Sequence, residues 1–581
     1  MRKLLAITFA LLFSSTVQSQ SQAIFLDGRT DDWSPSSPTY IDSQNEGGTY
    51  DFKYFSAAND ENFLYLKMKV TPFIKLLENN LISVYIDGDN NSSTGLQING
   101  IGAELRFGFG YRNGFNYYTN STATHSSLRF RSLPTVTDTV FEMAIGRQQI
   151  PPAGGSGTIR IFFADNSASG DIMPDNGVTF SYTFDNTPTV PITPVEINRE
   201  DTTLLRVMNW NTLEDGLTDP AREQSYRRIL QAVKPDVIGF NEVWDATASE
   251  IRSKLNSMIP LQNNSWNTVK LDAGNIIASR YPVLQSWIVY SGQRITASLI
   301  DVPDRFGKDF LVINCHYKCC GGASNDATRQ READATIAFL LDAKSPGGVI
   351  TLPQNTPFVI MGDLNFVGER QQLKTLLTGE IINTQLFGNG GKPDWDNTDL
   401  EDLISMQSDK RTAYTWRDDP GSYPPSRLDY QIYSNSAVNV EKSFVIQTEI
   451  MSQARLSRYG FLQSDTKTAS DHFPKVSDIS FRKSVNVQNT ISELKFELYQ
   501  NFPNPFNPRT IINYELRIKN FVVLKVYDIA GKEVATLVNN FMPEGKHAVE
   551  FNASDISSGV YFYSLSVDGK QMGVKRMALV K

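Results

Sequence analysis

Eight polar side chains in the central part of this 581-residue sequence follow apolar runs or sit in short polar motifs. They are Asn211, Glu242, His316, Asp363, Asn365, Asp429, Asp471 and His472. Glu242 follows the apolar run 237–240, for example, and Asp363 follows the run that starts at Phe358. Where strands end at one edge of a packed scaffold, such side chains can meet in a single cleft. The sequence therefore predicts a polar cleft built from distant segments.

The residue types in this set suit the metal-assisted hydrolysis of an anionic ester. A phosphodiester resists attack by water until its charge is neutralised, and carboxylate and amide oxygens can hold a divalent cation that does so. We expect Glu242 to be a direct ligand, with Asn211 and Asp471 adjacent, and the metal to be Mg²⁺, with Mn²⁺ or Ca²⁺ as alternatives. Two of the chain's four histidines, His316 and His472, belong to the set, and imidazole suits proton transfer near neutral pH.

Each motif taken alone also has an ordinary structural explanation. The Asp363 and Asn365 side chains can shape a turn, and Asp471 can cap a helix. The order of the motifs is more specific, because Asn, Asn-Glu, Asn-x-His, Gly-Asp-x-Asn, Arg-x-Asp-Tyr and Ser-Asp-His follow one another within residues 201–480. Together with the stretch 274–282, this order resembles the endonuclease/exonuclease/phosphatase superfamily.

The resemblance implies a four-layer α/β sandwich and a phosphoester hydrolase. It also implies that Asp429 orients His472, as carboxylates fix a histidine tautomer in other hydrolases. Asp363 and Asn365, two residues apart on an extended segment, would position the water and a phosphate oxygen. His316 would stabilise the developing charge or protonate the leaving oxygen, and base and acid can be exchanged in this scheme.

The substrate does not follow from this fold. The pair Thr415-Trp416, followed by Arg427-Leu-Asp-Tyr430, resembles the nuclease members more than the inositol-phosphate phosphatases, so we expect DNA or RNA as substrate. A sphingomyelinase-like or other phosphoester hydrolase is the alternative. A second alternative is a non-catalytic surface carbohydrate-binding protein, which leaves the joint presence of the polar set without a chemical reason.

The elements that must position the cleft differ along the chain. Short alternating runs in residues 20–187 indicate an antiparallel β-sandwich. The proline-rich stretch 188–200 has the composition of a linker. From residue 201 to 480, strand-like runs alternate with helical ones, including predicted helices over 221–233 and 328–343. We therefore expect a multidomain chain whose catalytic domain is of the α/β class.

The N-terminal sandwich resembles carbohydrate-binding and DOMON-like modules through the segments 27–33 and 85–95. We expect an accessory domain, with glycans as its candidate ligands. Its aromatic residues form either a sugar platform or part of the core; they are Trp33, Phe115, Tyr117 and Tyr118. The segment 87–93 is dense in oxygen ligands and either binds Ca²⁺ or forms an Asx-rich hairpin turn.

Residues 495–581 form a third β-rich region. The segments 498–508, 526–532 and 558–561 resemble the C-terminal sorting domain of the bacterial type IX secretion system. The resemblance implies recognition by the type IX machinery, passage across the outer membrane, and release or surface attachment. The alternative is a small Ig-like β-sandwich without a sorting role.

The beginning of the chain has the pattern of a secretory signal peptide. Arg2 and Lys3 precede the short apolar run 4–13, which leads us to expect a signal peptide over residues 1–19. The protein is therefore expected outside the cytoplasm, and we expect a monomer. A net charge of −8 is mild evidence against tight binding of DNA, although not against hydrolysing it.

Three further residues leave alternatives open. The chain has only three cysteines, all within residues 315–320, so no disulfide framework supports the fold. Cys319 and Cys320 either form a strained vicinal disulfide or remain free thiols. Arg329 either contacts a substrate phosphate or lies solvated on its helix.

Overall fold

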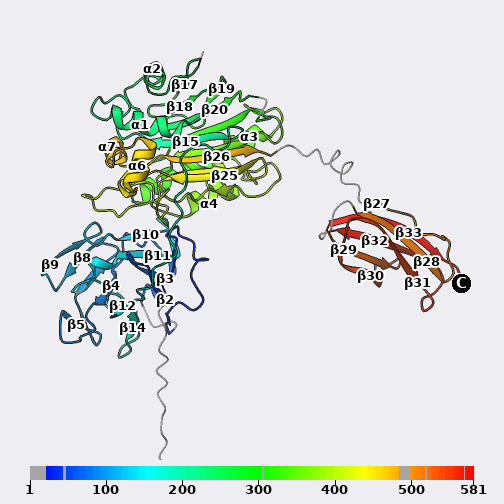
Figure 1. The fold of residues 1–581 in the computed structure, drawn as a ribbon, viewed down its shortest axis with the longest axis horizontal. Helices are drawn as coiled ribbons and strands as arrows, with labels where there is room; N and C mark the ends of the chain where they lie inside the picture. Colours follow the sequence, from blue (N-terminus) through cyan, green and yellow to red (C-terminus); the bar gives the residue numbers. More distant parts are fainter. Residues whose placement is uncertain are drawn as a thin grey trace, which may run out of the picture. The chain divides into compact units, whose positions relative to one another are not determined.

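The computed structural model describes residues 21–43, 48–152, 154–262, 264–303, 306–482, 497–516, 520–567 and 570–581. The chain divides into two compact units, residues 1–482 and 483–581 (Figure 1). The predicted signal peptide, residues 1–19, lies outside the described residues. Among the described helices, none has the length and apolar character needed to cross a membrane.

The first unit begins with a β-sandwich of two sheets. One sheet has the order β1-β2-β3-β11-β10, and the other has the order β13-β12-β4-β7-β8-β9, with β14 beside β12. Alternate side chains of β3, such as Leu66 and Met68, are fully buried between the sheets, as a period of two requires. The strands are β1 (Thr39–Ile41), β2 (Asp51–Asn59), β3 (Phe63–Ile74), β4 (Ile82–Asp87), β5 (Leu96–Ile98), β6 (Ile101–Ala103), β7 (Leu105–Gly108), β8 (Asn113–Asn116), β9 (Ser121–Thr124), β10 (Arg131–Leu133), β11 (Asp138–Gly146), β12 (Thr158–Asp165), β13 (Ile172–Met173) and β14 (Phe180–Thr183).

Two mixed six-stranded sheets follow in the same unit. Their orders are β17-β18-β16-β15-β26-β25 and β19-β20-β21-β22-β24-β23. The strands are β15 (Leu205–Asn211), β16 (Val237–Asn241), β17 (Asn267–Val269), β18 (Ile276–Ser279), β19 (Val283–Ile288), β20 (Ile295–Ile300), β21 (Phe310–His316), β22 (Phe358–Asp363), β23 (Glu401–Asp402), β24 (Asp429–Tyr433), β25 (Val438–Val445) and β26 (Lys475–Phe481). The helices are α1 (Glu223–Val233), α2 (Ala248–Met258), α3 (Ala323–Lys344), α4 (Gln371–Thr378), α5 (Thr384–Phe387), α6 (Gln453–Tyr459) and α7 (Asp465–Ala469).

These sheets and helices form four layers. Apolar side chains such as Val207 and Val312 form the core between the two sheets. The outer face of the first sheet packs against α1, α2 and α6, and the outer face of the second packs against α3 and α4. The predicted four-layer α/β sandwich is confirmed. The predicted helix over 221–233 corresponds to α1, and α3 begins earlier than the predicted start at residue 328.

The β-sandwich and the α/β layers share a close interface. The Leu26 N–H donates to the carbonyl of Arg411, and the Leu26 carbonyl accepts from the Ala413 N–H, which forms a bridge between Leu26 and Thr412. Lys75 forms an ion pair with Asp326 on α3. Ile197, within the predicted linker, is fully buried against the first sheet. The sandwich therefore belongs to the same compact body as the α/β layers.

The second unit is a small β-sandwich, described by itself. Its sheets have the orders β27-β28-β31 and β30-β29-β32-β33. Alternating side chains such as Ile512, Tyr514, Val522 and Leu524 fill its core. The strands are β27 (Glu497–Leu498), β28 (Arg509–Leu516), β29 (Asn520–Tyr527), β30 (Glu533–Met542), β31 (Gly545–Asn552), β32 (Gly559–Val567) and β33 (Lys570–Leu579).

A buried ion pair ties β15, which ends at Asn211, to β26, which begins three residues after His472. Arg206 on β15 donates two hydrogen bonds, of 2.6 and 2.7 Å, to Asp478 on β26, and both side chains are almost fully buried. Replacing Arg206 by Met leaves the Asp478 carboxylate buried without this partner. We expect a loss of about 3 to 5 kcal/mol in the free energy of unfolding, measured by urea denaturation.

The matched control for this prediction is Arg458→Met. Arg458 forms an exposed ion pair with Glu196, and such pairs contribute less than about 1 kcal/mol. Equal stability of the two variants would contradict the importance of the buried pair.

Candidate active site

The candidate residues lie where strands of the two central sheets end or begin. Asn211 is the last residue of β15, and Glu242 directly follows β16. His316 ends β21 and Asp363 ends β22, and the two residues are paired across these parallel strands. Asp363 is paired in turn with Asp429, the first residue of β24. The register of the sheets therefore brings these side chains to one edge.

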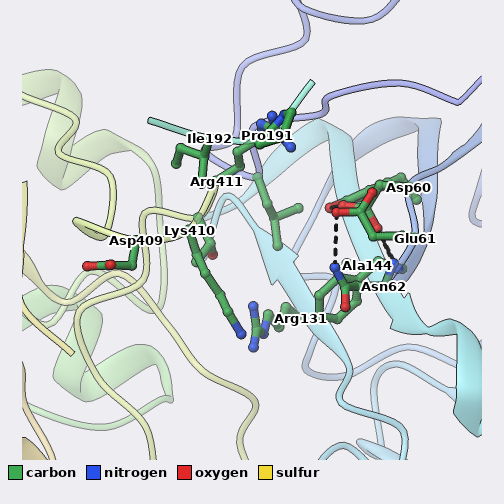
Figure 2. Close-up of a pocket in the computed structure, with 14 residues that line it drawn as sticks. Asp60, Glu61, Asn62, Arg131, Ala144, Pro191, Ile192, Asp409, Lys410 and Arg411 are labelled. Carbon is green, nitrogen blue, oxygen red and sulfur yellow. Dashed lines mark hydrogen bonds between the residues drawn. The ribbon is translucent and has the colours of Figure 1, made fainter. Parts of the chain in front are cut away.

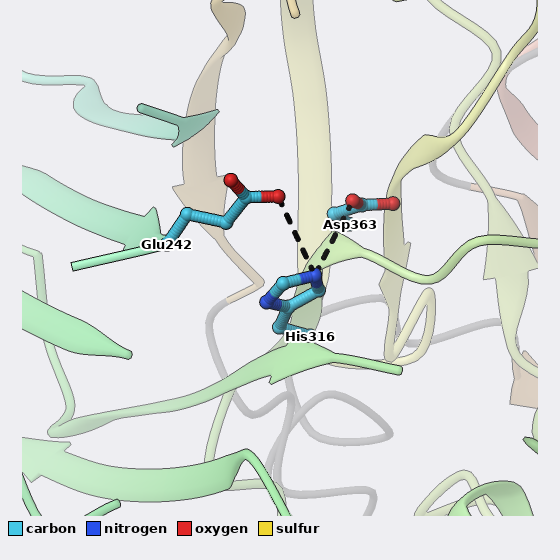
Figure 3. A group of neighbouring side chains, drawn as sticks. All are labelled: Glu242, His316 and Asp363. Carbon is cyan, nitrogen blue, oxygen red and sulfur yellow. Dashed lines mark ion pairs between the residues drawn. The ribbon is translucent and has the colours of Figure 1, made fainter. Parts of the chain in front are cut away.

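Three of these side chains converge on one point. Ligand atoms of Glu242, His316 and Asp363 all lie within 4.8 Å of one another (Figure 3). His316 Nε2 is 3.9 Å from Glu242 Oε1 and 3.7 Å from Asp363 Oδ2. The Asn211 side chain donates hydrogen bonds to the same two carboxylates, at 2.9 and 3.1 Å. Carboxylate and imidazole donors at this spacing fit a divalent cation.

The electrostatic environment also favours a cation. Burial raises the pKa of Asp363 to about 7, against the lowering effect of His472 and with further raising by Asp429 and Glu242. Burial, assisted by nearby Arg294, holds the pKa of His316 well below its usual value. A neutral imidazole keeps a lone pair for a metal or for a proton. A cation between these groups would compensate buried negative charge that the protein leaves partly unbalanced.

His472 and Asp429 form a hydrogen-bonded pair beside this group. His472 Nδ1 lies 2.8 Å from Asp429 Oδ2, and its Nε2 lies 3.7 Å from Asp363 Oδ2. Burial lowers the pKa of His472, but the Asp429 and Asp363 carboxylates outweigh burial and raise this pKa to about 10. The backbone N–H of Asp429 donates to Thr415 Oγ1 at 2.9 Å, which fixes the start of β24.

The two remaining candidates, Asn365 and Asp471, lie at the border of the site. Asn365 is buried with a left-handed backbone (φ +49°), and its side chain donates to the carbonyl of Tyr317 at 3.2 Å. Asp471 Oδ2 accepts a hydrogen bond of 2.8 Å from the Trp416 indole. One oxygen of Asp471 is therefore engaged with Trp416, and among the described residues the acidic and histidine group around His316 does not include it.

The structure bears on the two alternatives that the sequence left open, for Arg329 and for the pair Cys319 and Cys320. Arg329 is fully buried and donates to Asp326 and to the carbonyls of Lys318 and Cys320. It is therefore neither a solvated arginine nor free to bind a phosphate. Cys319 and Cys320 are free thiols, and the Cys320 thiol donates to the Cys319 sulfur.

Sequence reasoning did not single out Asn241 and Ser470, whose side chains form hydrogen bonds to the backbone of the site residues. The Asn241 side chain accepts from the Asp363 backbone N–H at 3.0 Å and donates to the side chains of Asn275 and Asn314. Ser470 Oγ donates to the carbonyl of Asn211 and accepts from the His472 N–H. The signal that could have found Asn241 is its position directly before Glu242 in the Asn-Glu motif.

Half-buried aromatic and basic groups stand beside His316. The ring centroid of Trp244 lies 5.6 Å from that of His316. The Arg294 guanidinium lies 5.3 Å from the Trp244 ring and donates to the carbonyl of His316. The wall of the site near His316 therefore combines an aromatic face with positive charge.

The β-sandwich contains a second acidic group. Oxygens of Asp87, Asp89 and Glu104 lie within 4.8 Å of one another, and one buried oxygen each of Asp87 and Glu104 lacks a hydrogen-bond partner. The predicted oxygen-rich segment thus brings together ligands of the kind Ca²⁺ uses. Of the predicted aromatic platform, Trp33 is buried and donates to Glu142, whereas Tyr118 is exposed.

Comparisons with known proteins agree with this architecture. Residues 208–472 match the model of the Endonuclease/Exonuclease/phosphatase family, and residues 500–579 match that of the Secretion system C-terminal sorting domain. No curated protein is significantly similar to the chain.

Solved structures were matched as well. An endonuclease/exonuclease/phosphatase from Beutenbergia cavernae DSM 12333 is 16% identical, with 65% of this chain and 100% of that chain covered and a TM-score of 0.30. An AP endonuclease from Leishmania major is 14% identical, with 51% and 93% covered and a TM-score of 0.30. A carbohydrate binding module of family 9 from Caldicellulosiruptor kristjanssonii is 16% identical, with 30% and 98% covered and a TM-score of 0.21.

The His472–Asp429 pair predicts a pH dependence of the metal-free protein. Because its pKa of about 10 lies above the ordinary 6.5, protonated His472 stabilises the folded state fully below pH 6.5. This stabilisation disappears as the pH rises through about 10. We expect the His472 imidazole resonance, followed by NMR in excess chelator, to stay that of the protonated ring at pH 8, roughly midway between these values.

The test variant for this prediction is Asp429→Asn, which removes a carboxylate from His472 and should move the titration toward the ordinary value. Asp419→Asn, which removes an exposed carboxylate, is the control and should leave it unchanged. A wild-type His472 that titrates near 6.5 would refute the prediction.

Proposed function

We propose that this protein, which contains an endonuclease/exonuclease/phosphatase domain and a secretion sorting domain, is an exported metal-dependent nuclease. The domain makes it a phosphoester hydrolase, and the sorting domain indicates secretion or attachment to the cell surface. The observation that carries the finer proposal is the convergence of Glu242, His316 and Asp363 beside the His472–Asp429 pair.

In this proposal Glu242 and Asn211 hold the cation, and His316 is a further donor. Mg²⁺ is the expected ion, and when bound it would neutralise a phosphate oxygen. Asp471 remains a proposed second contact through Oδ1, because its Oδ2 accepts from Trp416. The donor set, rich in oxygen and partly buried, fits such an ion.

The proposed proton transfers combine the geometry of the site with the pKa shifts of the metal-free protein. Asp363, with a pKa of about 7, can take a proton from the attacking water at neutral pH. His472, with a pKa of about 10, is protonated and would donate a hydrogen bond to a phosphate oxygen, while Asp429 fixes its orientation. His316, with its low pKa, is a poor proton donor, which favours a role as a ligand over protonation of the leaving oxygen.

Nucleic acid is the proposed substrate because the wall beside His316 suits it. The half-buried Trp244 offers a face on which a base can stack. Arg294 and Lys318 place positive charge next to His316, which locally offsets the net charge of −8. We propose the N-terminal sandwich as an accessory module whose ligands include glycans.

The activity is tested by exchanging His472 for Ala. Cleavage of plasmid DNA and RNA should require a divalent cation and stop in excess chelator. His472→Ala should lower kcat by about 100- to 10,000-fold, because the protonated imidazole is lost. His547→Ala, a histidine of the C-terminal unit, is the matched control and should retain full turnover. Hydrolysis of sphingomyelin alone would indicate a lipid phosphodiesterase instead. Absence of hydrolysis of every substrate would contradict the proposal.

The metal site is tested by Glu242→Gln. The variant should need at least about tenfold more Mg²⁺ or Mn²⁺ for half-maximal activity, because a charged ligand is removed. Direct Mn²⁺ binding, followed by electron paramagnetic resonance, should weaken in parallel. Glu214→Gln changes an exposed neighbour whose backbone, not its carboxylate, contacts Glu242. Equal metal affinity in both variants would remove Glu242 from the ligand set.

A further inference from the structure

A cavity of about 270 Å³ lies where the β-sandwich meets the α/β layers (Figure 2). The sandwich lines it with residues 60–63 and with Tyr65 and Arg131, and the α/β layers line it with residues 409–412. We call it the seam cavity. Its volume is near the lower end of the range for small-ligand sites.

Positive side chains gather at one end of the seam cavity. In Figure 2 the Lys410 side chain extends toward the Arg131 guanidinium. Arg131 lies 5.0 Å from the Phe63 ring and 4.8 Å from the Tyr414 ring, and Arg129 lies 4.7 Å from the same Phe63 ring. Stacking engages the faces of a guanidinium and leaves its N–H edges free to donate.

Asp60 offsets the positive charge at this end of the cavity only in part, because the pKa values of Lys410 and Arg129 remain lowered despite its influence. Within the described part of the chain, Arg129, Arg131 and Lys410 form no ion pair. Asp60 accepts from the Phe63 N–H and the Tyr65 hydroxyl, and Asp409 pairs with Arg455 at 2.7 Å. The nearby carboxylates are therefore already engaged with other donors.

The three cations destabilise one another. Burial, together with the neighbouring Arg131 and Arg129, lowers the pKa of Lys410 to about 8. Burial and the neighbouring Arg131 likewise lower the pKa of Arg129. A bound anion would remove this cost, since charge-assisted hydrogen bonds from guanidinium and ammonium groups suit tetrahedral oxyanions.

We propose that the seam cavity binds the phosphate or sulfate group of a small anionic ligand, held by Lys410 and Arg131 with Arg129 behind them. The site is distinct from the group around His316, and the inference does not depend on the proposed nuclease activity. Two cations with free donors on opposite sides of the seam would make the bound anion a bridge between the sandwich and the α/β layers.

The test is isothermal titration calorimetry on the full chain in excess chelator. Chelator keeps the candidate active site free of metal, so its carboxylates repel added anions. The probes are inorganic phosphate, sulfate and a 5′-mononucleotide. Lys410→Met and Arg131→Met should each weaken binding by at least about tenfold, because each removes a charge-assisted hydrogen bond. Lys392→Met, which removes an exposed lysine paired with Asp399, should bind like the wild type.

The outcomes separate the sources of the anion. A mononucleotide that binds at least about tenfold tighter than phosphate identifies an organic phosphate, whereas equal binding identifies a free oxyanion. Without ligand, Lys410→Met should melt at the same temperature as the wild type or higher, because a repulsive charge is gone. Arg131→Lys, which keeps the charge, serves as a second variant and should retain part of the binding. Absence of binding, or binding that survives both Met variants, would overturn the proposal.

Discussion

The site depends on holding several carboxylates and two imidazoles at one edge of two packed sheets. Asp363 is the centre of this arrangement, because it contacts Asn211 and faces both His316 and His472. Like charges this close in a buried site repel one another. The protonated His472 compensates part of the negative charge, and the Asn241 side chain fixes the backbone of Asp363. The remaining imbalance is the physical basis for proposing a cation at this site.

The β-sandwich contributes to the same arrangement from outside. His125 Nε2 lies 2.9 Å from the carbonyl of Gly421, and the Arg112 guanidinium stacks 4.1 Å from the Tyr423 ring. Thr135 donates to the carbonyl of Phe366, next to Asn365. These contacts brace the loops that lead to Trp416, to Asp429 and to Asn365. Removing the sandwich would therefore loosen loops of the site, even if its own ligand were irrelevant to catalysis.

The sequence was sufficient to predict the candidate residues at the strand ends, but not the contacts that surround them. Glu242 and Asp363 could be found because each follows an apolar run, and a sheet brings such ends together. The burial of Ile197 and Arg329 could not be read in the same way, because it arises from contacts with segments distant in sequence. The high pKa of His472 likewise depends on Asp363 and Asp429, which adjoin it only in the folded chain.

The two charged sites of the first unit pose opposite electrostatic problems. Around His316 the fold concentrates carboxylates beyond what its own cations balance. At the seam it concentrates cations that form no ion pair with any of the described residues. Neither arrangement helps the protein to fold, since uncompensated buried charge costs stability. Neutral residues of similar size in place of Asp363 or Lys410 would fill the same space without the uncompensated charge. The presence of Asp363 and Lys410 is therefore best explained by ligands of the opposite charge, a cation at the first site and an anion at the second.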